Sequence, residues 1–454
     1  MQVHIPMEYL NSRLTRPVRI SIMIGLIALF FIISPLVILY TAGYRYNWQT
    51  RTMSQTGVMS INAKPVNASV FINDVLIDKQ LPIRLPNQIP GTYHIRIESP
   101  SYHPWKKEIT VESKKTAYIR DIILYKLSTP ELFFQPTHGL ITQVEFSHDS
   151  TFALITSQSN ENKTIELLSL LDGTRILVKN VADSTLTQAY WSPYSQHAVV
   201  ISIHGNVLSL LVIDPKKPNA FVEHTYTSNI TLSNSKILWN KNVVPDFWIR
   251  TSDEVITEVR SVDMRTIATS TPPVWFVTNE TLWTYSPSTQ TLRKTSGSRE
   301  QIFPLQNSTL VHIVDINEHH IIANSTEETL MFEILDDAII LRQSIPTMSL
   351  THDVLKDAWI AWSPWEVWSI HADGVPTLQN RTNTKIQSVF PVDEAGSLLF
   401  VHDNRLDAYN PVYNTLHTLA DSITIMTTGV SRETRTIYFW GHTGEQDGIF
   451  RLAY

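Results

Sequence analysis

One run of 21 uncharged residues near the N-terminus constrains this chain more than any other feature. Residues 20–40 read ISIMIGLIALFFIISPLVILY, and a helix of this length spans roughly 30 Å, the thickness of the hydrocarbon core of a bilayer. Pro35 is tolerated in a membrane helix, and the four aromatic residues at positions 40, 44, 46 and 48 suit the water–lipid interface. We therefore expect a transmembrane helix over residues 20–42 that contacts the lipid bilayer.

A cleaved signal peptide and a buried soluble helix are the alternatives for this run. A signal peptide has an apolar core of roughly 7–15 residues and small residues at its cleavage site. Here the apolar run is longer, and Tyr40 and Ala42 would occupy the −3 and −1 positions. A soluble helix needs a polar face, which this run lacks. A retained anchor is the expectation.

The arginines that flank the run indicate its orientation. Three precede it (Arg13, Arg16 and Arg19) and two follow it (Arg45 and Arg51), a bias that favours an N-terminus inside the cell. About 400 residues follow with no second run of this kind. We expect a single-pass protein of the cell membrane, with a cytoplasmic tail over residues 1–19, a linker over residues 43–56 and the bulk of the chain outside the cytoplasm.

Composition excludes several classes of protein and site. The chain has 36 Lys+Arg against 42 Asp+Glu, a net charge of −6, which offers no electrostatic footprint for nucleic acid. Its hydrophobic fraction of 43% is too high for a disordered chain. It has no Cys, so disulfides, thiolate metal sites and Cys nucleophiles are excluded.

Residues 57–127 are expected to form a small β-sandwich. Alternation of apolar and polar residues is clear at 68–72, 93–97, 108–111 and 119–122, and a period of two gives each strand one buried and one wet face. Turn signals separate these runs, among them Pro90-Gly91 and Ser99-Pro100.

The same segment resembles the PEGA domain, a β-sandwich module of prokaryotic surface proteins. The resemblance rests on five elements in order: Pro-Val-Asn-Ala at 65–68, the strand 69–73, Leu-Pro-Ile at 81–83, Pro-Gly-Thr-Tyr at 90–93, and Ser-Tyr-His-Pro-Trp at 101–105. Asn67 and Ser101 stand where the family has Gly, and Asn is a common substitute where a positive φ is needed. The resemblance implies a non-enzymatic module that binds or acts as a spacer.

Residues 130–454 are expected to form a β-propeller. An aromatic residue followed by a Ser-containing turn precedes an apolar strand at 146–150, 191–195 and 362–365. The first two copies lie 45 positions apart and the third lies 171 positions further on, close to four such steps. A period of about 40–45 residues with four strands per unit is typical of a propeller. The length predicts about seven blades, with six or eight as alternatives.

The Trp-Ser-Pro units resemble the WD40-like repeats of TolB-type propellers. The Asp-Gly of the family turn is missing from most copies here. The predicted fold is thus mainly β: a single transmembrane helix, a small β-sandwich, and then a propeller of about seven blades.

No catalytic, cofactor or metal motif stands out in the sequence. Glu318-His319-His320 and Asp336-Asp337 are interpreted as turns, because adjacent side chains on a strand or turn point apart. Trp359, Trp362, Trp365 and Trp368 are interpreted mainly as blade core, with the first two on opposite faces of a strand. Trp365, in a turn, is the candidate for an exposed binding residue.

These observations favour a membrane-anchored binding or scaffold protein. Its propeller would present a loop face to an envelope protein or a cell-wall glycan. An extracytoplasmic propeller hydrolase or lyase and a single-span envelope sensor subunit are the alternatives. An enzyme would carry convergent carboxylates or histidines at equivalent blade positions; His148, Tyr194 and Trp365, which we place in comparable turns, share no chemistry. We expect no enzymatic activity.

Overall fold

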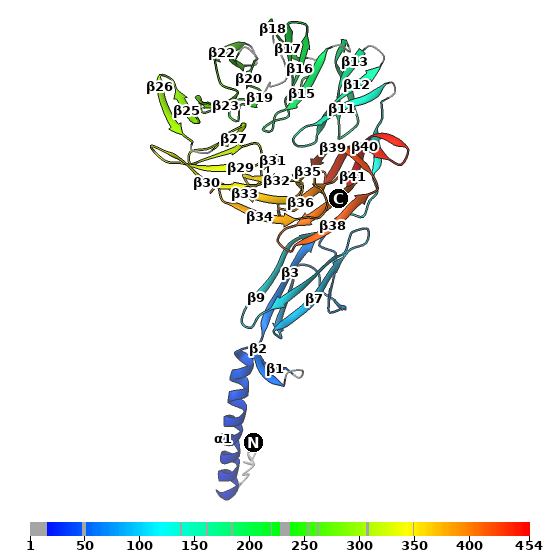
Figure 1. Cartoon of the computed structure of the whole chain (residues 1–454). Helices are drawn as coiled ribbons and strands as arrows, with labels where there is room; N and C mark the ends of the chain where they lie inside the picture. Colours follow the sequence, from blue (N-terminus) through cyan, green and yellow to red (C-terminus); the bar gives the residue numbers. More distant parts are fainter. Residues whose placement is uncertain are drawn as a thin grey trace, which may run out of the picture. The chain divides into compact units, whose positions relative to one another are not determined.

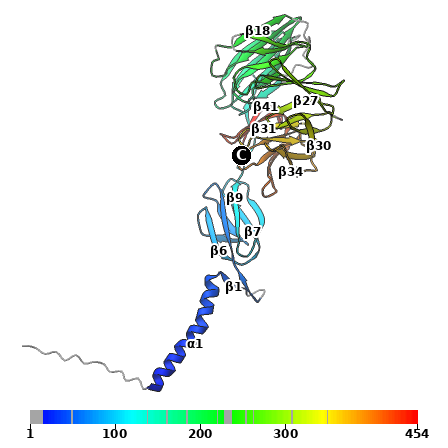
Figure 2. The same ribbon diagram turned by 90° about the vertical axis from the view of Figure 1, so that its left-hand side faces the viewer.

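The structure is a computed structural model that describes residues 16–47, 51–136, 139–159, 162–182, 185–218, 220–227, 237–251, 254–260, 263–305, 308–347 and 349–454. The chain is mainly β with one N-terminal apolar helix, as the sequence predicts. It divides into two compact units, Met1–Leu124 and Tyr125–Tyr454 (Figures 1 and 2).

Helix α1 (Arg16–Thr41) is long and apolar enough to cross a membrane. It has 26 residues, a mean hydropathy of 2.9 and no buried residue, so most of its apolar surface is left exposed by the described chain. A hairpin of β1 (Tyr44–Asn47) and β2 (Thr52–Gln55) follows it. The Arg45 guanidinium donates to the Tyr40 carbonyl at 2.9 Å and lies 3.8 Å from the Tyr40 ring, which satisfies a carbonyl that the helix end leaves open.

Two small sheets build the rest of the smaller unit. The first has the order β6 (Ile83–Gln88), β3 (Gly57–Lys64) and β9 (Thr116–Ile123), with β3 and β9 parallel. The second has the order β5 (Val75–Ile77), β4 (Ser69–Ile72), β7 (Gly91–Glu98) and β8 (Trp105–Val111).

Alternation along these strands produces the core of the smaller unit. Met59 and Ile61 of β3 are fully buried, as are Ile95 and Ile97 of β7 to within 1%. At the two positions where Gly was expected, Ser101 has a φ of 64°, whereas Asn67 is not among the described residues with positive φ. The expectation of a left-handed residue at Asn67 is therefore wrong, because the backbone there turns without one.

The described residues of the larger unit form eight four-stranded antiparallel sheets in chain order. We number them sheet 1, β11 (Leu140–Phe146), β12 (Phe152–Ser159), β13 (Asn162–Ser169), β14 (Arg175–Ala182); sheet 2, β15 (Leu186–Trp191), β16 (Ala198–His204), β17 (Val207–Ile213), β18 (Val222–Thr227); sheet 3, β19 (Ile237–Trp239), β20 (Phe247–Arg250), β21 (Ile256–Val259), β22 (Met264–Ala268); and sheet 4, β23 (Val274–Thr278), β24 (Thr281–Ser286), β25 (Thr291–Ser296), β26 (Arg299–Pro304).

The second half of the unit repeats the same arrangement. It contains sheet 5, β27 (His312–Ile316), β28 (His320–Asn324), β29 (Thr329–Ile334), β30 (Ile339–Ile345); sheet 6, β31 (Ser349–Asp353), β32 (Ala358–Trp362), β33 (Glu366–Ile370), β34 (Pro376–Arg381); sheet 7, β35 (Ser388–Pro391), β36 (Leu398–Val401), β37 (Arg405–Asn410), β38 (Thr415–Asp421); and sheet 8, β39 (Thr424–Ser431), β40 (Thr436–Thr443), β41 (Gln446–Ala453) with β10 (Glu131–Phe134) beside β41.

Hydrophobic clusters join each sheet to the next, and the series returns to its start. Seven clusters connect consecutive sheets. An eighth packs Tyr438 and Ile449 of sheet 8 against Ala153 and Ile155 of sheet 1. The Tyr438 hydroxyl donates to the Leu170 carbonyl at 2.8 Å across the same junction. Figure 1 shows the sheets following one another around the unit.

The described part of the larger unit forms eight sheets, whereas the sequence spacing predicts about seven blades, with six or eight as alternatives. The first strands of sheets 1 and 2 start at Leu140 and Leu186, a step of 46 residues, whereas those of sheets 7 and 8 start at Ser388 and Thr424, a step of 36. The longer steps come early in the chain, so a period taken from the first two copies was too long.

A buried polar group in sheet 7 supports the packing between strands. Asp407 of β37 has 1% of its side chain exposed and contacts the His402 Nε2 at 3.2 Å and the Arg405 Nε at 2.9 Å. Thr418 donates to its other oxygen at 2.8 Å, and the His402 Nδ1 donates to the Lys385 carbonyl at 2.8 Å. A carboxylate this deeply buried needs such partners to be tolerated.

We expect the Asp407→Asn substitution to lower the free energy of unfolding by about 1–3 kcal/mol, because it removes the buried acceptor that contacts the Arg405 guanidinium and the His402 imidazole and places an amide there instead. Urea unfolding of the detergent-solubilised chain, followed by circular dichroism, measures the change. Asp421→Asn, at an exposed position of the neighbouring strand, is the matched control and should stay within about 0.5 kcal/mol. Equal unfolding midpoints for the two variants would contradict the expectation.

Candidate functional site

Turns from five sheets meet around one cavity of about 490 Å³. The turns that follow the first strands of sheets 2 to 6 contribute Tyr194, the segment 240–242, Asn279, the segment 317–318 and Asp357. The turn after β33 in sheet 6 adds the segment 371–374. Because neighbouring sheets place equivalent turns side by side, residues far apart in the sequence become one lining.

Most of these first turns share a side-chain acceptor. Directly after the first strand, or as its last residue, a Ser, Asn or Asp oxygen accepts backbone N–H groups of its own turn at Ser147, Ser192, Asn240, Asn317, Asp353, Asp393 and Ser431. Such side chains satisfy turn donors in place of a backbone partner. Sheet 4 instead uses a tight two-residue turn, with Asn279 and Glu280 at φ values of 46° and 60°.

This shared acceptor marks the repeat, and the aromatic-Ser motif of the sequence matches it in only some of the sheets. Phe146-Ser147 and Trp191-Ser192 end equivalent first strands, but Trp362 ends β32, the second strand of sheet 6. The third copy of the motif is therefore at the wrong turn, and His148 and Tyr194 are comparable to each other but not to Trp365. Ser363 accepts from its own turn, so the same local chemistry in another place produced the false match.

Aromatic rings form the walls of the cavity. Trp239, Trp248 and Phe276 are nearly buried beneath it, and Trp283 is 2% exposed with the Lys294 ammonium 5.2 Å from its ring. Trp359 is half-buried at the opposite side. The walls thus combine apolar surface with groups from sheets 3, 4 and 6.

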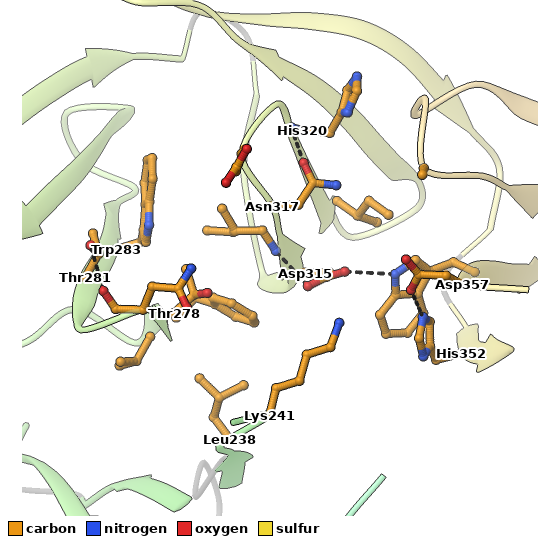
Figure 3. A pocket seen from close by; sticks show the side chains of 18 of the residues that line it. Leu238, Lys241, Thr278, Thr281, Trp283, Asp315, Asn317, His320, His352 and Asp357 are labelled. Carbon is orange, nitrogen blue, oxygen red and sulfur yellow. Dashed lines mark hydrogen bonds and ion pairs between the residues drawn. The ribbon is translucent and has the colours of Figure 1, made fainter. Parts of the chain in front are cut away.

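The carboxylates of the cavity are held by fixed donors. Asp315 accepts from the Trp359 indole at 3.1 Å and from the Ile316 N–H at 3.0 Å. The His352 Nε2 lies 3.2 Å from the Asp357 carboxylate, and the His352 ring lies 4.8 Å from that of Trp359. Figure 3 shows both pairs beside each other. The oxygens are therefore positioned as acceptors.

Two further polar side chains reach into the cavity. Lys241 is exposed, extends from its turn toward the centre (Figure 3), and has no carboxylate within 4.0 Å among the described residues. Tyr194 is 40% exposed and lines the cavity. Burial, and then the negative charge of Asp315, raises the pKa of Tyr194 to about 12, so its hydroxyl stays protonated at neutral pH.

The structure places the residues singled out in the sequence in different surroundings. Glu318 and His319 lie in the expected turn between β27 and β28, whereas His320 is the first residue of β28. Glu318 and His320 line the cavity, and the rings of His319 and His320 lie 6.4 Å apart at 75°. The described residues hold no group of three or more His, Asp or Glu placed for a metal ion. The pair 336–337 is the expected turn between β29 and β30.

The four tryptophans of sheet 6 occupy different environments. Trp359 and Trp368 pack in one hydrophobic cluster and Trp362 in another, so opposite faces are confirmed for Trp359 and Trp362. Trp365 is 51% exposed in the turn after β32. Trp365 comes after the last residue of β32, whereas Trp359 lies near the first residue of the same strand. Trp365 does not line the cavity.

A salt bridge connects three sheets near this end of the unit. The Arg432 guanidinium, in the turn after β39, lies 2.9 Å from Asp353 at the end of β31 and donates to the Pro391 carbonyl at the end of β35 at 3.0 Å. Asp353 has 3% of its side chain exposed. Sheets 6, 7 and 8 are thus linked by one cation.

Comparison with known proteins identifies the smaller unit's module. Residues 56–124 match the PEGA domain family, which confirms that resemblance for this part of the chain. No curated protein matches the chain.

Among solved structures, the chain is similar to the uncharacterized protein lmo1340 of Listeria monocytogenes EGD-e, with 12% identity and a TM-score of 0.42 over 63% of this chain and 98% of that one. It is also similar to a chain in the mitotic checkpoint complex (10%, 0.44, 73% and 93%) and to Hsv2 of Kluyveromyces lactis (10%, 0.41, 61% and 97%). TM-scores below 0.5 do not identify the fold of this chain.

We expect Arg432→Met and Asp353→Asn to show a coupling energy of about 1–3 kcal/mol in a double-mutant cycle of unfolding free energies. Each single substitution leaves one buried partner uncompensated, whereas the double substitution removes both charges. Asn at position 353 keeps the oxygen that accepts from the Leu355 N–H, so the turn is retained. Additive single effects in urea unfolding would show that the bridge does not link the sheets.

Proposed function

We propose that this chain is a membrane-anchored binding protein whose larger unit is a β-propeller of eight blades. The support for a propeller is the succession of eight four-stranded sheets and eight interfaces, together with the pairing of β10 with β41. A strand from each end of the unit then completes one blade, which removes two exposed sheet edges. In this proposal the ring of blades is a rigid support for the turns that line the cavity.

The anchor is proposed to hold the PEGA module and the larger unit outside the cytoplasm. Its support is the apolar helix α1, with no buried residue, and the PEGA match that follows it. Helix α1 would span the bilayer with residues 1–19 inside, and the PEGA module would act as a spacer. The protein would then present its cavity to the cell envelope.

The observation that supports binding most directly is the lining of the cavity. Two of its carboxylates, Asp315 and Asp357, contact the Trp359 indole and the His352 imidazole, and the cavity walls are aromatic. Pockets of this kind, apolar with a few fixed polar groups, are typical of ligand recognition. An envelope protein or a cell-wall glycan is the proposed partner, and an extracytoplasmic hydrolase, a lyase or a sensor subunit remains the competing function.

The absence of Cys makes the orientation measurable. We expect a single Cys introduced by Glu445→Cys, in an exposed turn between β40 and β41, to react with a membrane-impermeant maleimide on intact cells or spheroplasts. A single Cys introduced by Ser12→Cys should react only after permeabilisation. The reverse pattern would place the bulk of the chain in the cytoplasm and overturn the proposed location.

We expect the full chain, solubilised from its own membranes in detergent, to retain a stoichiometric envelope partner or to bind purified cell wall. The turnover of generic ester and glycoside substrates should remain at background in the same preparation. A turnover above background that is lost in Asp315→Asn would favour the hydrolase instead. Trp365→Leu, at the far end of β32, should leave binding unchanged, because its side chain lies outside the cavity.

A further inference from the structure

The charges that line the cavity are almost balanced. Two ammonium groups, Lys241 and Lys294, face three carboxylates, Asp315, Glu318 and Asp357. The Asp357 carboxylate contacts an imidazole, and the Lys294 ammonium lies over an aromatic ring. A strongly charged ligand would leave some of these groups without compensation. The balance therefore favours a ligand without net charge.

The polar groups offer both donors and acceptors from several sheets. The side-chain oxygens of Asn240 and Asn317 accept from their own turns, so the amide nitrogens at the other end of these side chains serve as donors. The Asn242 amide donates to the Asn279 oxygen at 3.3 Å and joins two neighbouring turns. With the Lys241 ammonium and the fixed Asp315 and Asp357 oxygens, the cavity can match a group that both donates and accepts, which is what a hydroxyl does.

Aromatic rings lie next to these polar groups. Tyr194 is 40% exposed and Trp359 is half-buried, and the two come from sheets 2 and 6. A sugar ring has apolar C–H faces and a rim of hydroxyls, so it suits aromatic walls interrupted by amides, carboxylates and a lysine. A purely apolar ligand would bury these polar groups without partners, at a cost in free energy.

A second, smaller hollow shares one lining residue with the cavity. His371 lines both the cavity and a space of about 270 Å³ between sheets 6 and 7. Lys356, Ser369 and Gln379 also border this space. The adjoining hollow provides room for a second ring of a chain whose first ring occupies the cavity.

We propose that the cavity, together with the adjoining hollow, binds a neutral oligosaccharide. One ring lies in the cavity between Tyr194 and Trp359, with its hydroxyls on Lys241 and Asn317, and the next ring extends past His371. This inference rests on the proposed binding function and names the chemical class of the ligand. It also places the ligand at the end of sheet 6 that lies opposite to Trp365.

The test uses the full chain in detergent and oligomers of N-acetylglucosamine and of glucose with one to four rings, titrated by calorimetry. We expect saturable binding of one series that strengthens from one ring to two. Tyr194→Leu and Lys241→Met should each weaken binding by about tenfold, the equivalent of one lost contact. Trp365→Leu is the aromatic control and should bind like the parent, and circular dichroism of each variant checks that it folds.

Three results would overturn the proposal. The first is no binding of either series, the second is equal binding by the parent and both cavity variants, and the third is a preference for carboxylated oligosaccharides of the same length. If the neutral series fails but a stoichiometric protein partner is lost in Tyr194→Leu, the cavity binds protein and only the sugar assignment falls. If no partner, cell wall or sugar binds, the binding function falls as well.

Discussion

The pairing of β10 with β41 is the interaction on which the larger unit depends. Leu132 pairs with Phe450, and the Arg451 guanidinium lies 3.0 Å from Glu131. Every sheet buries its faces against its neighbours, so the first and last sheets would each expose an apolar face if they did not meet. The contact of Tyr438 with Leu170 shows the two packed together. Without Cys, this junction relies on strand pairing and packing alone.

Once neighbouring sheets are packed, their first turns lie in order around one end of the unit. The acceptor side chains of those turns keep the backbone compact, and this leaves the following residues free to project. Lys241 and Tyr194 project in this way from turns capped by Asn240 and Ser192. The lining of the cavity is thus a consequence of similar turns repeated on neighbouring sheets.

Much of the architecture could be predicted from local patterns. The apolar run of α1, the alternation of the smaller unit and the order of its PEGA elements are all local features, and each depends on residues close together in the sequence. Gly is scarce, at 14 of 454 residues, and of 17 described non-Gly residues with positive φ, seven are Asn or Asp. These residues tolerate the left-handed region better than other side chains do.

The candidate site could not be predicted in this way. Asp315 and Trp359 are 44 positions apart and form a hydrogen bond only because sheets 5 and 6 are neighbours. The turn acceptor changes between Ser, Asn and Asp, so no single letter marks the repeat, and Trp362-Ser363 imitates it at a different turn. The sequence predicts that Trp365 is exposed, and this is confirmed. Exposure alone does not show which end of a sheet carries a cavity.

The sequence by itself determined the apolar helix, the mainly β class and the PEGA module, because hydrophobic length, periodicity and turn residues act over short distances. Only the tertiary structure decided the number of sheets, the junction of β10 with β41 and the residues that share the cavity. These features depend on which sheet faces bury one another, and that choice is made by packing between segments that the order of residues leaves far apart.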